Sequence, residues 1–310
     1  MSFIVTGASG RFARLATQML LERIPPSELI CVTRRPQELA SLASRGVRVR
    51  AGDFDKPEGL RAAFEGGTRM LLISTLSVGR RAEQHLAAIN AAAAAGVRHI
   101  VYTSSGGAHP QNPAIVIPDH LKTEQALERS GLAYTILRDS LYIEAPLNHI
   151  APRALQTGVW IASAGEGRVG FVAKHDCVEC AVRALTTPGH EGRTYEITGP
   201  ELLSFSDVAR IASEVDGRPI EFRAVTDDEM ATMLAAAGVP QHYKEGMFTT
   251  GVGTSSIADI VSYEQGIRGG YFAVLSDHVR QLLGRPPVSV REMFVANREA
   301  LRLTYVPGPS

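Results

Sequence analysis

The chain has 310 residues, 45% of them hydrophobic, and its 32 basic and 32 acidic side chains cancel to a formal charge of zero. This length and composition favour a globular protein that buries a full hydrophobic core. The charge balance argues against nucleic acid or an anionic membrane surface as a partner, because the basic runs Arg34-Arg35 and Arg80-Arg81 are too short to form a strong positive field.

The compartment is predicted from the cysteines and from the apolar runs. No run approaches the roughly 18 apolar residues that a transmembrane helix needs, and the chain opens on a strand-like segment rather than on a signal sequence. Cys31, Cys177 and Cys180 are too few for a disulfide framework and fit a reducing compartment. We expect a cytoplasmic protein with no membrane partner.

The first motif is a turn suited to binding an anion. Residues 3–5 are apolar, residues 6–13 read TGASGRFA, and a helical apolar pattern follows. The glycines allow a tight turn and a close approach to a pyrophosphate, and the helix that follows offers free N–H groups. A dinucleotide pyrophosphate is therefore expected to bind at Gly7, Ser9, Gly10, Arg11 and Phe12.

Strand-like and helix-like segments alternate through the first half of the chain. The apolar, β-rich runs are 2–6, 29–33, 47–51, 69–73, 98–103 and 133–138. This alternation predicts an α/β fold, a doubly wound parallel sheet of the Rossmann type with helices on both faces. Ligands of such sheets bind at the carboxyl ends of the strands.

The second of these runs ends in Arg34 and Arg35 rather than in an acidic residue. A carboxylate would bind the ribose hydroxyls of NAD(H), whereas a guanidinium offers paired donors to the 2′-phosphate of NADP(H). The sequence thus favours NADPH as the cofactor. The alternative is that both are surface arginines that open the helix near Pro36.

The next strand ends carry groups suited to the rest of a dinucleotide. Asp53 is placed to accept from the adenine amino group while Phe54 covers the ring, although Asp53 is also a good cap for a helix near Pro57. Hydroxyl side chains that would flank the ribose and the nicotinamide end the fourth and fifth strands: Ser74, Thr75, Thr103 and Ser104.

The alternation of strand-like and helix-like segments breaks near residue 139. This break predicts that the rest of the chain forms a second, structurally different part. A helix is expected near 146–157, with short strands at 159–161 and 170–172 and a helix from Asp176. We expect a core at 1–140 with a return segment near 166–190, and a smaller C-terminal α/β layer at 141–310 that covers the substrate.

Within this second part, Tyr142 follows the sixth strand, where it would stack on a flat substrate or line the nicotinamide pocket; simple packing is the alternative. Ser204-x-x-Asp207 and Thr226-x-x-Glu229 are capping boxes that begin helices. The small, polar segment 249–256 is expected to be a lid or an inert surface loop.

A redox or metal site is not expected. Cys177 and Cys180 begin a helix, as a redox dithiol would, but they stand at small-residue positions beside a plausible cap, Asp176. The nine histidines form no H-x-x-x-H pair, and a zinc site at the cysteines would need two further ligands.

The segments TGASGRFA, GDFD, LLIST, VYTSSGG, DHLKTEQAL and YTILRDSLY occur in this order. With them the chain resembles the short-chain dehydrogenase/reductase superfamily and, within it, the atypical NmrA-like branch that includes type 2 NAD(P)H:quinone oxidoreductases and triphenylmethane reductases. The resemblance spans nearly the whole chain. It implies a reductase with NADPH and a small-molecule substrate.

The resemblance also exposes a departure from the superfamily. Its catalytic members carry a Tyr-x-x-x-Lys pair after the fifth strand, in which Tyr donates a proton to the substrate. Here Val116 falls at the Tyr position and His120 at the Lys position. His120 is expected to bind the nicotinamide ribose or to assist proton transfer, because its unperturbed pKa lies near neutrality; a solvated side chain is the alternative. Ser104 and Tyr142 are expected to complete the catalytic group.

The missing proton donor favours an acceptor that takes a hydride readily, such as a quinone. The predicted function is flavin-free hydride transfer from NADPH to a flat, electron-poor acceptor. Two alternatives stay open: an NAD(P)-binding redox sensor of the NmrA type, and a reductase of a biosynthetic imine or enone. The sequence also leaves a homodimer open.

Overall fold

The computed structural model describes residues 1–242 and 256–302, which form two compact units. Unit 1 comprises residues 1–105, 119–138 and 175–195. Unit 2 comprises residues 106–118, 139–174 and the chain from 196 onward. The chain passes between the units several times, so neither of them is one continuous segment.

The central sheet has seven strands in the order β3-β2-β1-β4-β5-β6-β9. The strands are β1 (Phe3–Val5), β2 (Leu29–Thr33), β3 (Arg48–Ala51), β4 (Arg69–Leu72), β5 (His99–Ser105), β6 (Ala133–Asp139) and β9 (Arg193–Ile197). The pairings β1·β2, β2·β3, β1·β4 and β4·β5 are parallel. The strand order reverses between β1 and β4, which confirms the predicted doubly wound sheet and gives it a switch point where ligands bind.

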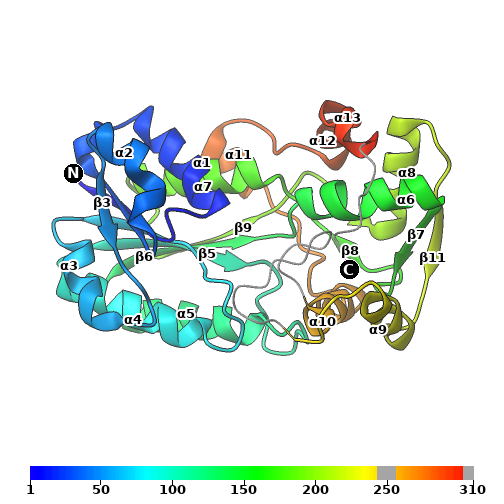
Figure 1. Cartoon of the computed structure of the whole chain (residues 1–310), viewed down its shortest axis with the longest axis horizontal. Coiled ribbons are helices and arrows are strands. Elements are labelled where there is room, and N and C mark those ends of the chain that lie inside the picture. Colours follow the sequence, from blue (N-terminus) through cyan, green and yellow to red (C-terminus); the bar gives the residue numbers. More distant parts are fainter. Residues whose placement is uncertain (243–255, 303–310) are drawn as a thin grey trace. The chain divides into compact units, whose positions relative to one another are not determined.

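Helices cover both faces of this sheet. Figure 1 shows α1 and α7 on one side and α3, α4 and α5 on the other. The helices associated with the sheet are α1 (Arg11–Leu21), α2 (Ala40–Ser44), α3 (Leu60–Phe64), α4 (Arg81–Ala94), α5 (Ile117–Arg129) and α7 (Lys174–Thr186). Strands covered on both faces are mostly apolar, as in β2, in which all five residues are buried and only Thr33 is polar.

A large apolar core lies between the sheet and one helical layer. It includes Ile4 from β1, Ile30 from β2, Phe64 from α3 and Tyr102 from β5. Tyr102 contributes its ring to this core, so its hydroxyl needs a partner in the interior. That partner belongs to the candidate site described below.

Unit 2 holds two small sheets and the remaining helices. β7 (Val159–Ala162) pairs in parallel with β11 (Glu221–Ala224), and β8 (Arg168–Val169) is antiparallel to β10 (Leu203–Ser204). The helices are α6 (Ala151–Thr157), α8 (Phe205–Asp216), α9 (Asp227–Ala236), α10 (Ile257–Arg268), α11 (His278–Leu283), α12 (Val290–Ala296) and α13 (Arg298–Arg302). Both predicted capping boxes are confirmed, at the starts of α8 and α9.

Two predicted boundaries are wrong. The strand expected at 170–172 lies two residues earlier, as β8 at Arg168–Val169, where it pairs with β10; Val172 makes a single bridge to Tyr142 instead. The helix expected from Asp176 begins at Lys174. The segment 249–256 lies outside the described residues except for Ser256, which caps α10.

Within residues 1–242 and 256–302, no helix has the length and apolar character needed to cross a membrane.

Candidate active site

The turn between β1 and α1 has the geometry of an anion site. Gly7 has a φ of +59°, and its carbonyl accepts from the backbone N–H of Gly10 at 2.8 Å. Only glycine adopts this φ without strain. Within the described chain, no side chain caps α1 at Gly10, and the first turn carries no acidic residue. Backbone N–H groups at this terminus are therefore available to a negatively charged ligand.

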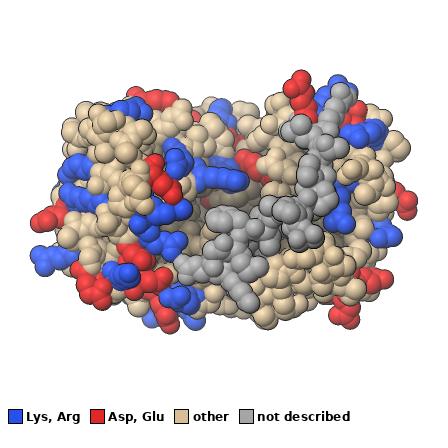
Figure 2. Space-filling model, viewed as in Figure 1, with Lys and Arg blue, Asp and Glu red and all other residues tan. Residues whose placement is uncertain are grey.

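Four exposed arginines stand near this turn. Ser9 Oγ lies 3.0 Å from Thr33 Oγ1, which links the turn after β1 to the end of β2. We define the arginine rim as the exposed side chains Arg11, Arg14, Arg34 and Arg35. Figure 2 shows Lys and Arg side chains, with acidic side chains among them, on the surface of unit 1. The rim fits a phosphate group in chemical type and in position.

Glu38 is the counter-ion of part of the rim. Its carboxylate lies 2.9 Å from Nη1 of Arg35 and 3.5 Å from Nη2 of Arg14. Arg14 also donates from Nε to the Ser9 carbonyl at 2.9 Å. Both arginines are thus held beside the turn by contacts within unit 1.

The predicted adenine residues adopt a local arrangement. The Asp53 carboxylate accepts from the backbone N–H of Asp55 at 3.1 Å, and Lys56, not Asp53, precedes the short 3-10 helix at Pro57. The alternative role of Asp53 as a helix cap is therefore wrong. Phe54 lies edge-on to the His85 ring, at 6.5 Å between centroids.

Arg81, His120 and Tyr102 form a buried chain of hydrogen bonds. Nη1 of Arg81 lies 3.0 Å from Nε2 of His120, and Nδ1 of His120 lies 2.8 Å from the Tyr102 hydroxyl. A guanidinium only donates, so Nε2 accepts and the proton of the neutral ring lies on Nδ1, which donates to Tyr102. Burial, with the Arg81 charge second, lowers the pKa of His120 well below its ordinary value. The ring is therefore neutral.

His85 continues this network. The backbone N–H of Thr75 donates to its Nε2 at 3.1 Å, so Nδ1 carries the proton and donates to the Thr123 hydroxyl at 3.0 Å. Burial, followed by the Arg81 charge, lowers the pKa of His85 to about 3. Tyr102 also hydrogen-bonds to Thr123, and burial raises its pKa above the ordinary value. We define the interior cluster as Arg81, His85, Tyr102, His120 and Thr123.

The loop between β4 and α4 is fixed by Arg81 of the interior cluster and by two neighbouring residues, Asp119 and Thr103. Nε of Arg81 donates to the Thr75 carbonyl at 2.6 Å, and the Asp119 carboxylate accepts from the backbone N–H of Gly79 at 2.7 Å. The hydroxyl of Thr103 accepts from the backbone N–H of Ser74 at 3.0 Å. The predicted residues Ser74, Thr75, Thr103 and His120 are thus held around one loop.

The predicted acid–base role of His120 depended on a pKa near neutrality. The pKa of His120 is lowered well below that value, because burial penalises the charged ring. The basis of the prediction is therefore wrong. The single N–H is directed to Tyr102, and both ring nitrogens have partners. The alternative of a solvated side chain is also wrong, since His120 is buried. A contact between His120 and a nicotinamide ribose stays a prediction.

Ser104 belongs to a second buried group. Its hydroxyl donates to Oε1 of Glu124 at 2.6 Å, and Glu124 forms a two-point ion pair with Arg138, at 3.0 Å to Nε and 2.7 Å to Nη2. The Ser104 proton is therefore directed to a carboxylate, and the serine oxygen is left with acceptor capacity. Ser104 is placed to accept a hydrogen bond rather than to act as an acid.

Tyr142 lies in unit 2, among charged side chains. Its hydroxyl donates to Oδ2 of Asp139 at 2.9 Å, and Nζ of Lys174 lies 5.0 Å from the centroid of its ring. The Glu144 carboxylate accepts from the backbone N–H of Lys174 at 3.0 and 3.1 Å. Tyr142 is half-buried. The stacking of Tyr142 on a flat substrate stays a prediction.

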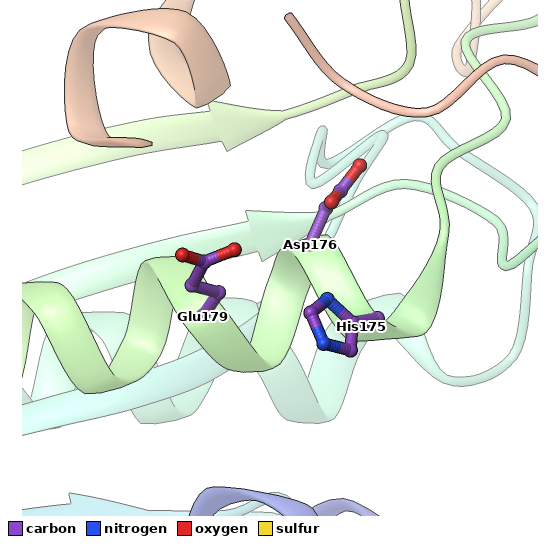
Figure 3. A group of neighbouring side chains, drawn as sticks. All are labelled: His175, Asp176 and Glu179. Atoms are coloured by element: carbon purple, nitrogen blue, oxygen red, sulfur yellow. The ribbon is translucent and has the colours of Figure 1, made fainter. Parts of the chain in front are cut away.

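One group in unit 1 could hold a metal ion by composition. His175, Asp176 and Glu179 lie on the first turns of α7, with their ligand atoms within 4.8 Å of one another (Figure 3). Both carboxylates already take part in other interactions, and all three residues come from one helix. We therefore propose no metal there. Cys177 and Cys180 are buried in the same helix.

Sequence reasoning missed several of these residues. In the sequence, Arg81 stands out only as half of a short basic run. Arg81 and His85 lie four residues apart, however, and so share one face of α4. Glu124 lies four residues after His120 on α5 in the same way. This spacing was the available signal. Nothing in the sequence pointed to Lys174.

Residues 7–188 match the model of a family described as NAD(P)H-binding. The chain belongs to this NAD(P)H-binding family. It is 32% identical to quinone oxidoreductase 2 of Escherichia coli over 288 residues, which cover 93% of this chain and 96% of that protein. It is 29% identical to an NAD(P)H azoreductase of Xenophilus azovorans, over 96% of this chain and 98% of the relative.

Solved structures agree over nearly the whole chain. The NADPH-dependent quinone oxidoreductase of Escherichia coli, complexed with NADPH, has a TM-score of 0.85 at 30% identity and covers 96% of this chain and 99% of its own. The triphenylmethane reductase of Citrobacter sp., complexed with NADP(H), has a TM-score of 0.84 at 30% identity, with the same coverage. The resemblance is confirmed, and this member of the family is an NAD(P)H-dependent oxidoreductase.

Proposed function

We propose that the protein transfers a hydride from NADPH to a quinone-like acceptor without a flavin. The observation that carries this proposal lies on α5 and on the residue just before it. The position of the superfamily tyrosine is occupied by buried Val116, and the only ring N–H of His120 is directed to Tyr102. A simple ketone requires a positioned acid there, whereas an electron-poor quinone accepts a hydride without one. The names of the E. coli and Xenophilus relatives support an acceptor of this class.

NADPH supplies the hydride, and we assign its parts to the described residues of unit 1. The turn after β1 holds the pyrophosphate, Arg34 and Arg35 hold the 2′-phosphate, and Asp53 with Phe54 holds the adenine. The loop between β4 and α4 contacts the ribose and the nicotinamide. The full set of proposed cofactor residues is Gly7, Ser9, Gly10, Arg11, Phe12, Arg34, Arg35, Asp53, Phe54, Ser74, Thr75, Thr103 and His120. Ser104 and Tyr142 are proposed to face the substrate.

The test is the loss of NADPH absorbance when purified protein meets a panel of quinones, with NADH measured in parallel. We expect saturable oxidation with a preference for NADPH. The supernatant of denatured protein, examined for flavin fluorescence, tests the flavin-free part. Tight NADPH binding without turnover on any acceptor would replace this proposal with the redox sensor.

A further inference from the structure

Thr75 is held at three points by side chains from one stretch of α4. Its backbone N–H donates to Nε2 of His85 at 3.1 Å, and its carbonyl accepts from Nε of Arg81 at 2.6 Å. Its hydroxyl donates to Oε1 of Gln84 at 2.7 Å. Gln84 lies three residues after Arg81 and His85 lies four after it, so the three share one face of the helix. The backbone and the side chain of Thr75 are therefore both fixed by α4.

Gln84 continues from Thr75 to a second loop of unit 1. Gln84 is buried, with 6% exposure, and its Nε2 donates to Oδ1 of Asp55 at 3.0 Å. The backbone N–H of Asp55 donates in turn to the Asp53 carboxylate at 3.1 Å. Residues 53–55, the adenine loop, follow β3, whereas Thr75 follows β4, and β2 and β1 lie between those strands in the sheet. One buried amide thus joins the loops after two strands that are not neighbours.

The carboxylate of Asp55 sets the direction of these hydrogen bonds. A carboxylate only accepts, so the amide nitrogen of Gln84 is the end that faces Asp55. The amide oxygen then faces Thr75, whose hydroxyl uses its one proton to donate to Gln84. The Thr75 oxygen keeps acceptor capacity alone. A ligand group that binds there must donate, as a ribose hydroxyl does.

We propose that Gln84 is a positioning residue that links the adenine side of the cofactor to its nicotinamide side. This inference rests on the cofactor placement in the proposed function, in which Asp53 and Phe54 hold the adenine and Thr75 contacts the ribose or the nicotinamide. Gln84 holds the Thr75 hydroxyl as an acceptor for the cofactor. Asp55, on the adenine loop, holds the Gln84 amide in the orientation that this requires.

Asp55 has a second partner, which provides a comparison within the same cluster. Nη2 of Arg80 donates to the same Oδ1 of Asp55, and the Arg80 side chain is 59% exposed. Exposed ion pairs contribute little to stability, whereas the hydrogen bonds of the buried amide have no water to replace them. Loss of Arg80 therefore leaves the Gln84 amide oriented, and loss of Asp55 does not.

The first experiment compares the binding of two ligands to the full-length protein by calorimetry. NADPH carries both sides of the cofactor, whereas adenosine 2′,5′-bisphosphate carries the adenine side without the nicotinamide. Gln84→Met keeps the size of the side chain and should raise the Kd of NADPH by about threefold to tenfold, as expected for one hydrogen bond. The Kd of the bisphosphate should change by less than about twofold. Gln125→Met, at an exposed glutamine on α5, is the matched control and should change neither Kd.

A double-mutant cycle separates positioning from a general loss of structure. Thr75→Val removes the hydroxyl and should raise the Kd of NADPH by a similar factor. Because Gln84 acts through Thr75, Gln84→Met should add less than about twofold in the Thr75→Val background. A full additional loss in that background overturns the inference, because Gln84 would then act by another route. An equal loss of NADPH and bisphosphate binding in Gln84→Met overturns it as well.

Asp55→Ala tests the same link from the other end of the amide, and it does so even if Gln84→Met fails to fold. The quantity measured is the Kd of NADPH divided by the Kd of the bisphosphate, in which effects on the shared 2′-phosphate cancel. This ratio should rise by about twofold to fivefold in Asp55→Ala and by less than about twofold in Arg80→Ala. Equal ratios in the two variants overturn the role of Asp55 in orienting Gln84.

These binding measurements separate the inference from the proposed function. If Asp53→Ala leaves the Kd of the bisphosphate at the wild-type value, the cofactor placement is wrong and this inference falls with it. If Asp53→Ala weakens the bisphosphate while Gln84→Met binds NADPH as tightly as wild type, the inference alone is overturned. Wild-type protein that binds NADPH but reduces no quinone overturns the proposed acceptor and leaves the link through Gln84 standing.

Discussion

The interior cluster and the arginine rim both lie in unit 1, but the ionisable side chains of the cluster are buried and those of the rim are exposed. In the interior cluster, burial makes both histidines neutral, and each N–H has one fixed partner. In the rim, the side chains of Arg14 and Arg35 are 52% and 60% exposed and share the Glu38 carboxylate. Buried groups thus fix the loops of the site, while exposed groups stay able to exchange one anion for another.

The largest effect is expected where a partly buried charge loses its buried partner. Glu124 is buried and pairs through two contacts with Arg138, whose side chain is 26% exposed. Glu124→Ala should lower the free energy of unfolding by about 2–4 kcal/mol, because the guanidinium and the Ser104 hydroxyl lose their acceptor. Urea unfolding measures this change. The matched control is Glu128→Ala, an exposed glutamate on the same helix, with an expected change within about 0.5 kcal/mol. Equal effects of both variants would mean that burial does not decide the cost of losing a carboxylate on α5.

The buried histidines should make the protein sensitive to acid. The folded pKa of His85 is about 3, below an unfolded value of about 6.5. Above pH 6.5 neither state binds the proton, so the stabilisation is fully present. As the pH falls from 6.5 toward 3, only the unfolded state binds it, and stability falls by about 1.4 kcal/mol per pH unit for each such histidine. His99, with a pKa lowered to about 4, contributes over the upper part of this range.

His85→Gln isolates one of these contributions. Its side-chain oxygen can accept from Thr75 but does not titrate, so the slope of stability between pH 6 and 4 should become shallower by about 1.4 kcal/mol per pH unit. Urea midpoints at several pH values measure the slope. His175→Gln, on an exposed histidine, should leave it as it is. An unchanged slope in His85→Gln would show that His85 is charged in the folded protein.

The contrast also explains what the sequence could and could not predict. The turn at Gly7 and Gly10, the buried strand β2 and the capping box at Ser204 depend on neighbouring residues, so local patterns predict them. The interior cluster depends on residues far apart: Arg81 and His120 are 39 positions apart and meet only when α4 and α5 pack. Burial then changes the pKa of His120, which no sequence motif states. Tyr142 was predicted as a site residue, but its neighbour Lys174 comes from another segment.

An intermediate effect is expected at the rim. If Arg34 contacts the 2′-phosphate, Arg34→Ala removes charge-assisted hydrogen bonds of about 1.5–3 kcal/mol in total, which is roughly tenfold to 100-fold in Kd for NADPH. NADH lacks that phosphate, so its Kd should change by less than about threefold. Fluorescence titration of both cofactors measures the difference, with exposed Arg61→Ala as the control. An equal loss of affinity for NADPH and NADH would mean that Arg34 does not contact the 2′-phosphate and is a surface arginine.

The smallest effect should come from Glu38. Whether NADPH binding becomes tighter or weaker in Glu38→Gln distinguishes two roles of this carboxylate. Glu38 holds Arg35 at 2.9 Å and Arg14 at 3.5 Å. If it competes with phosphate, Glu38→Gln should tighten NADPH binding by about twofold to fivefold, since exposed ion pairs contribute about 1 kcal/mol or less. The gain should shrink at high salt, because screening weakens exposed charges most. Weaker NADPH binding would mean instead that the carboxylate orders the arginines for the phosphate. The exposed arginines of the rim would then be held in fixed positions, as the buried residues of the interior cluster are. Burial would no longer explain which of the two regions is fixed.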